Sequence, residues 1–172
     1  MTENIDQEQE IPLINQEELV ILLQEMRLKQ NLPLAILAGI ISSLVGAAVW
    51  AAVTVATEYQ IGWMAVGVGF LVGFSVRFLG KGINDIFGYV GAAFSLFGCL
   101  LGNFLSILGF VSIQEGVGYF EMFGMVDYSR IPEIMTYTFQ PIDLLFYGLA
   151  IYQGYKFSFQ KLSSEQISRL EN

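Results

Sequence analysis

Arg77 and Asn103 are polar side chains within long apolar stretches, where they could bind a ligand or an ion. An ionised side chain inside an apolar membrane helix is by default a candidate functional site. The place of Arg77 near the end of its stretch instead favours an anchor that reaches lipid phosphate, and an ion pair with Asp85 is a third interpretation. Asn103 lies near the middle of its stretch, where an amide more often hydrogen-bonds a neighbouring helix than lines a pore.

Glu58 and Asp143 each stand beside an apolar stretch, and paired carboxylates can hold a cation. Nothing in the sequence fixes the distance between them, so solvated helix ends are the simpler interpretation. The chain has no His, a single cysteine (Cys99), and no HExxH, P-loop or GxSxG motif. We therefore predict no enzymatic activity, no metal site and no cofactor.

Composition indicates a membrane protein. The 172 residues are 54% hydrophobic and 14% charged, whereas soluble domains have about 45–50% apolar and about 25% charged residues. The net charge of −8 comes largely from residues 1–25, which contain acidic residues and no Lys or Arg. An acidic terminus argues against a nucleic-acid partner, because nucleic-acid binding needs a basic surface.

Long uncharged stretches predict an all-α, polytopic membrane helix bundle with four transmembrane helices. The fourth span must extend past Asp143 and Lys156, because the uncharged segment between them is too short to cross alone. With four spans, all of the eight basic residues except Arg130 lie on one side. We predict that the protein lies in the inner membrane. The positive-inside rule then places both of its termini in the cytoplasm. The predicted spans are residues 33–57, 60–78, 86–113 and 141–159.

The remaining segments are predicted to lie outside the membrane, and residues 32–160 form the transmembrane domain. An amphipathic cytoplasmic helix is expected over residues 15–31, with Asn15 as N-cap and Glu18 completing a capping box. This helix either packs on the bundle or membrane surface, or serves as a docking or oligomerisation helix. In the outer loop, Ser129 can cap a short helix that starts near Pro132 and Glu133. The other segments are a disordered acidic tail at 1–14, the apolar outer loop at 114–140 and a cytoplasmic tail at 161–172.

Small residues recur at near-helical spacing in two of the spans, which puts them on one face of each helix. In lipid, small faces allow helix backbones to approach closely. The rows predict packing surfaces inside one bundle, with a homo-oligomer interface or a substrate path along glycine-loosened helices as alternatives. The rows are Ala65, Gly69 and Gly73 in one span, and Gly91, Ser95, Gly98, Gly102, Ser106 and Gly109 in the next.

Two segments carry a resemblance to a known group of proteins. They are GIISSLVGAAVWAAVTVATEYQIGWMAVGVGFLVGFSVRFLGKG, at 39–82, and FGYVGAAFSLFGCLLGN, at 87–103. Together they resemble a group of uncharacterised bacterial multi-pass membrane proteins that share a GAxxW segment, a YQIGxMAxGVGxxVGxxVRxxGKG hairpin and a later span of small residues. The resemblance implies a membrane location and a bundle fold, without an assigned activity or site residues.

These observations lead to two hypotheses about function. The first is a non-enzymatic structural or accessory subunit that lies in the lipid bilayer and engages other membrane proteins or cytoplasmic proteins. The alternative is a small transporter or channel that works as a homo-oligomer, because four helices rarely enclose a path alone.

Overall fold

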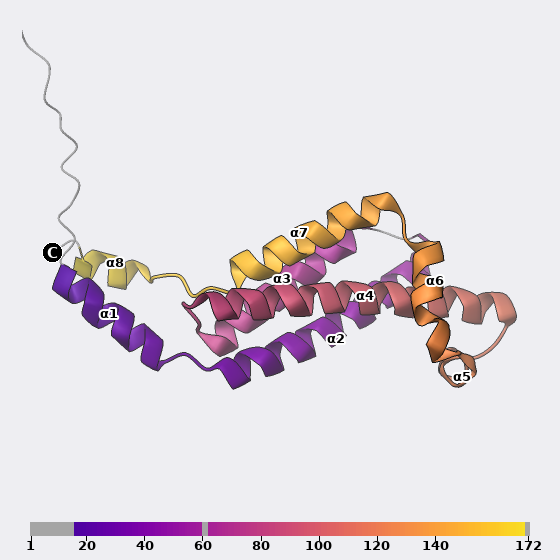
Figure 1. The fold of residues 1–172 in the computed structure, drawn as a ribbon, viewed down its shortest axis with the longest axis horizontal. Helices are drawn as coiled ribbons and strands as arrows, with labels where there is room; N and C mark the ends of the chain where they lie inside the picture. The colour runs from indigo at the N-terminus through magenta and orange to yellow at the C-terminus, as the bar shows by residue number, and fades with distance from the viewer. Residues whose placement is uncertain (1–15, 60–61, 171–172) are drawn as a thin grey trace, which may run out of the picture.

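The computed structural model describes residues 16–59 and 62–170, and this part of the chain is all-α, as the sequence predicts. Long helices run along a common axis (Figure 1). The central pair, α3 and α4, pack on each other, and each also packs on α2 and α7. The helices of this bundle are α2 (Leu32–Thr57), α3 (Trp63–Gly80), α4 (Asp85–Glu115) and α7 (Pro141–Phe157).

Three of these helices, α2, α3 and α4, are long and apolar enough to cross a membrane. This finding confirms the predicted membrane bundle in a coarser form. Helix α7 has 17 residues, which span about 25 Å at about 1.5 Å per residue, against a hydrocarbon core of about 30 Å. Among the described residues, α7 is therefore not one of the helices that are both long and apolar enough to cross, and the expected fourth span is not shown. Helix α7 also ends at Phe157, two residues before the predicted boundary.

The end of the bundle where α2 begins is fixed by the residues between its helices. The side chain of Asn31 accepts a hydrogen bond from the backbone N–H of Leu34 at 3.0 Å and so caps the start of α2. Pro33 fits the first turn because it has no N–H to leave unpaired. The N–H of Asn31 donates to the carbonyl of Gly80 at 2.8 Å, and the N–H of Gln160 donates to that of Gly82 at 2.8 Å. These bonds tie the ends of α2, α3 and α7 together.

Two short helices lie side by side beyond this end (Figure 1). They are α1 (Gln16–Leu28) and α8 (Ser164–Leu170), and they pack through Leu22, Met26 and Leu170. Helix α1 ends before the predicted residue 31, because Asn31 already caps the next helix. The expected cap Asn15 and the expected tail 1–14 lie outside the described residues. The segment predicted as a C-terminal tail contains α8.

The predicted outer loop is largely helical and crosses the other end of the bundle (Figure 1). It contains α5 (Tyr119–Met125), the 3-10 turn η1 (Tyr128–Arg130) and α6 (Ile131–Thr138). Helix α4 ends at Glu115, and its cap residue Gly116 has a positive φ of 66°, which favours a residue without a Cβ. The chain then returns, and Met122 of α5 packs on Phe104 and Leu108 of α4. The apolar side chains of α5 therefore cover the C-terminal part of α4.

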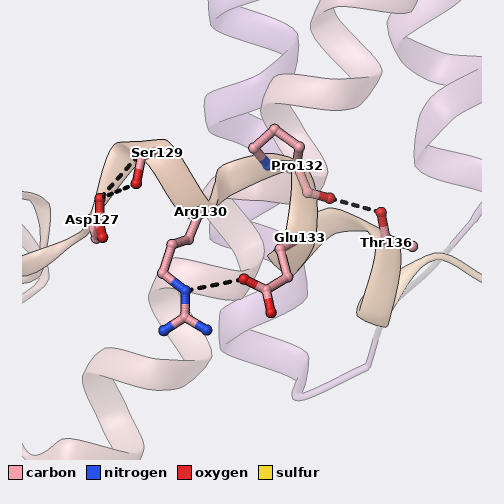
Figure 2. Close-up of polar contacts among 6 residues, drawn as sticks. All are labelled: Asp127, Ser129, Arg130, Pro132, Glu133 and Thr136. Atoms are coloured by element: carbon pink, nitrogen blue, oxygen red, sulfur yellow. Dashed lines mark hydrogen bonds and ion pairs between the residues drawn. The ribbon is translucent and has the colours of Figure 1, made fainter.

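Polar contacts organise the turn that leads into α6 (Figure 2). One carboxylate oxygen of Asp127 accepts hydrogen bonds from the N–H of Ser129 at 3.1 Å and from its hydroxyl at 2.7 Å. These donors lower the pKa of Asp127. Arg130 Nε donates to Glu133 at 3.0 Å, and the hydroxyl of Thr136 donates to the carbonyl of Pro132 at 2.7 Å. The expected short helix is present, but the acceptor at its entry is Asp127, and Ser129 is a donor.

Candidate functional site: polar groups inside the bundle

The small residues of α3 face α7. A Cβ atom on Gly69 would lie 2.6 Å from the carbonyl oxygen of Ala150 and 2.8 Å from its Cα. A Cβ atom on Gly73 would lie 2.9 Å from the Cβ of Phe157. Ala65 is also buried. The two helices therefore approach each other along a face that has no room for larger side chains.

The small residues of α4 serve more than one neighbour. Gly91 lies against the backbone of Gly154 in α7, Gly98 against Val68 of α3, and Gly102 and Gly109 against α2. Ser95 and Ser106 are buried, and each hydroxyl donates to the carbonyl four residues earlier, at 2.7 and 2.8 Å. The structure thus buries both rows between helices of a single chain. The buried members are Ala65, Gly69, Gly73, Gly91, Ser95, Gly98, Gly102, Ser106 and Gly109.

Asn103 joins two helices of the bundle. Its side chain is 1% exposed, and its Nδ2 donates to the hydroxyl oxygen of Tyr147 in α7 at 3.0 Å. Tyr147 is also buried, and its ring lies against that of Phe139, with 6.2 Å between the centroids. Asn103 therefore makes a hydrogen bond to a neighbouring helix, as expected for an amide near the middle of an apolar stretch.

Trp50 and Thr54 of α2 are further buried polar residues, and the sequence analysis did not single them out. They stand one helical turn apart, and their relative exposures are 2% and 0%. Within the described chain, the indole N–H of Trp50 and the hydroxyl of Thr54 have no hydrogen-bond partner. The ring of Trp50 covers Gly102, the residue before Asn103. A tryptophan with a threonine four residues later in an uncharged stretch is the signal that could have pointed to them.

Arg77 lies in the last turn of α3 and is partly exposed. The ion pairs of the described residues are Lys29 with Glu25 and Arg130 with Glu133, so the pairing of Arg77 with Asp85 has no support there. Lys81 directly follows α3. It caps the helix with a left-handed backbone (φ 49°) and leaves the helical path.

Glu58 and Asp143 occupy helix ends. The Asp143 carboxylate is 8% exposed and accepts the backbone N–H of Gln140 at 2.9 Å, so it caps the start of α7. Glu58 is exposed at the end of α2. Among residues 16–59 and 62–170, no group of three or more His, Cys, Asp or Glu side chains is placed to hold a metal ion.

The interior thus offers neutral donors and acceptors: an amide, a phenol, an indole N–H and a hydroxyl. Such groups stabilise helix contacts and can solvate a small neutral or cationic species. Comparison with known proteins does not select between these roles. No protein-family model, no curated protein and no solved structure matches this chain.

Proposed function

We propose that this chain is a non-enzymatic accessory subunit of the inner membrane, which binds a partner protein at its cytoplasmic end. The observation that carries the proposal is the helix pair α1 and α8, which stands beyond the bundle (Figure 1). One face of α1 packs on α8, while Val20, Ile21 and Leu28 are 54%, 57% and 87% exposed. Contiguous exposed apolar side chains are typical of interaction sites.

The proposal includes α7 as a fourth crossing. Helix α7 packs on both α3 and α4, and its length is at the short end of the range of about 17–25 residues for membrane helices. Lys156 near its inner end donates to the hydroxyl of Tyr152, one turn earlier, at 3.1 Å, so its ammonium group has a polar partner. A fourth crossing also gathers the basic residues other than Arg130 on one side, which the positive-inside rule assigns to the cytoplasm.

Purification of the full chain from native membranes in mild detergent tests the partner. We expect a protein at constant stoichiometry, and we expect the double variant Val20→Asn, Ile21→Gln to retain at least tenfold less of it. The physical reason is that the two polar side chains remove exposed apolar surface from α1. The packing residues Leu22, Met26 and Leu170 stay unchanged, although Ile21 also borders a groove beside Leu170. The measurement is quantitative mass spectrometry of the purified material.

The matched control is the double variant Val20→Ile, Ile21→Leu, which keeps the surface apolar and should retain the partner. Both variants should match the wild type in membrane abundance and melting temperature. Absence of a stoichiometric partner from the wild type, or equal recovery with the polar variant, would contradict the proposal.

A second candidate function is a small oligomeric transporter or channel. The unpartnered groups of Trp50 and Thr54 favour it, because polar side chains inside membrane helices often mark a path for solutes. Proton and potassium fluxes into reconstituted liposomes distinguish the two functions, since an accessory subunit gives no flux above empty liposomes. Flux through the wild type that is lost in a folded Asn103→Leu or Arg77→Lys variant would favour transport over the accessory role.

A further inference from the structure

A lateral groove lies between α2, α4 and α5, and its volume is about 490 Å³. This volume is within the range of about 300–1,000 Å³ that is typical of small-molecule sites. The side chains that line it are apolar except for one tyrosine hydroxyl. They are Ala48, Ala51, Ala52, Val55, Ala56, Leu105, Tyr119, Phe120 and Phe123.

The groove is about as long as the hydrocarbon layer of one leaflet is thick. Its α2 wall runs from Ala48 to Ala56, which is about 12 Å along the helix axis at about 1.5 Å per residue. One leaflet contributes about half of a hydrocarbon core of about 30 Å. In the proposed membrane bundle, on which this inference rests, α2 and α4 cross the bilayer and this wall faces hydrocarbon chains.

Helix α5 gives the groove an aromatic cover. The hydroxyl of Tyr119 donates to the carbonyl of Leu105 at 3.1 Å, and its ring lies 5.5 Å from that of Phe123 between centroids. Phe120 is 89% exposed at the edge. Because the one polar group of the lining is already bonded, the groove suits an occupant without hydrogen-bonding groups.

The charges around this end of the bundle select among lipid headgroups. Glu58, Glu115 and Glu121 are exposed there, while the basic residue Arg130 is bound to Glu133. Exposed acidic side chains at this end repel an anionic headgroup and attract an ammonium group. We propose that this groove binds one acyl chain of a zwitterionic, amine-bearing phospholipid, with the headgroup at this acidic end of the bundle.

Photo-crosslinking of the reconstituted full chain tests this site. The probe is phosphatidylethanolamine with a diazirine in the middle of one acyl chain, in vesicles of phosphatidylethanolamine and phosphatidylglycerol. We expect peptide mapping to find label concentrated on Ala52 and Phe123. Ala52→Phe fills the groove and should lower the Phe123 label at least fivefold. Ala93→Phe, an equal change at an exposed position of α4 that does not line the groove, should leave it unchanged.

Size-exclusion profiles and melting temperatures establish that each variant folds, and Ala56→Phe replaces Ala52→Phe if the latter does not. A phosphatidylglycerol probe with the same acyl chain should label Phe123 at least threefold less. Label spread evenly over the exposed faces of α2 and α4 and unaffected by the filling variants would overturn the groove as a site. Equal labelling by the two probes would overturn the headgroup preference.

Discussion

Gly69→Ala is expected to lower the free energy of unfolding by about 2 kcal/mol or more, near the upper part of the usual overpacking cost of about 1–3 kcal/mol. The added methyl group would lie 2.6 Å from the carbonyl oxygen of Ala150 and 2.8 Å from its Cα. These are backbone atoms of α7, so no side-chain rotation relieves the contact and the whole helix must move. Thermal unfolding in detergent, followed by size-exclusion chromatography with fluorescence detection, measures the loss.

Gly67→Ala is the matched control, since it lies on the same helix and an added Cβ meets no atom within 4 Å. It should be neutral or stabilise the protein by up to about 1 kcal/mol, because alanine is the better helix former. Gly102→Ala should fall between the two, because its nearest neighbour is the Trp50 side chain at 3.1 Å, which can shift slightly. Equal unfolding of the Gly69 and Gly67 variants would mean that α3 does not pack on α7.

Tyr147→Phe and Asn103→Leu are each expected to lower the free energy of unfolding by about 1–3 kcal/mol, the usual cost of removing one partner of a buried hydrogen bond. The bond runs from Asn103 Nδ2 to the Tyr147 hydroxyl at 3.0 Å, and both side chains are buried. Once one of the two side chains has been replaced, replacing the other lowers the free energy of unfolding by a smaller amount, because the hydrogen bond is already lost. A double-mutant cycle of unfolding in detergent should therefore give a combined loss smaller than the sum.

The control for this cycle is Tyr152→Phe, which removes an exposed hydroxyl from the same helix. Its bond with Lys156 is also exposed, and without the hydroxyl the long Lys156 side chain can extend to water at the end of α7. The variant should unfold like the wild type. Strictly additive losses for Asn103→Leu and Tyr147→Phe would show that the hydrogen bond between α4 and α7 does not couple these residues.

Local sequence signals predicted the long helices and the rows of small residues. An uncharged stretch and a four-residue spacing are properties of one segment, so they can be recognised without its neighbours. The partners of each row depend on tertiary packing. Gly91 meets α7 while Gly102 meets Trp50 of α2, and nothing in the spacing distinguishes these two positions.

Contacts between distant segments likewise could not be predicted from the sequence. The contact of Leu22 in α1 with Leu170 in α8 connects the two ends of the chain. The entry to α6 was missed in detail because both Asp127 and Ser129 are good capping residues, and only the geometry of the turn makes Asp127 the acceptor. Trp50 and Thr54 were overlooked because their burial depends on α4.

The central claim is a four-helix membrane bundle whose two ends lie on the same side, and cysteine accessibility tests it most directly. Cys99 is fully buried, and Cys99→Ala supplies the background for single cysteines at Gln114, Ser129 and Ser164. In intact cells, an impermeant maleimide should label the cysteines at Gln114 and Ser129. It should label the one at Ser164 only after the membrane is permeabilised. Labelling at Ser164 from outside intact cells would mean that α7 does not cross and would contradict the four-span bundle.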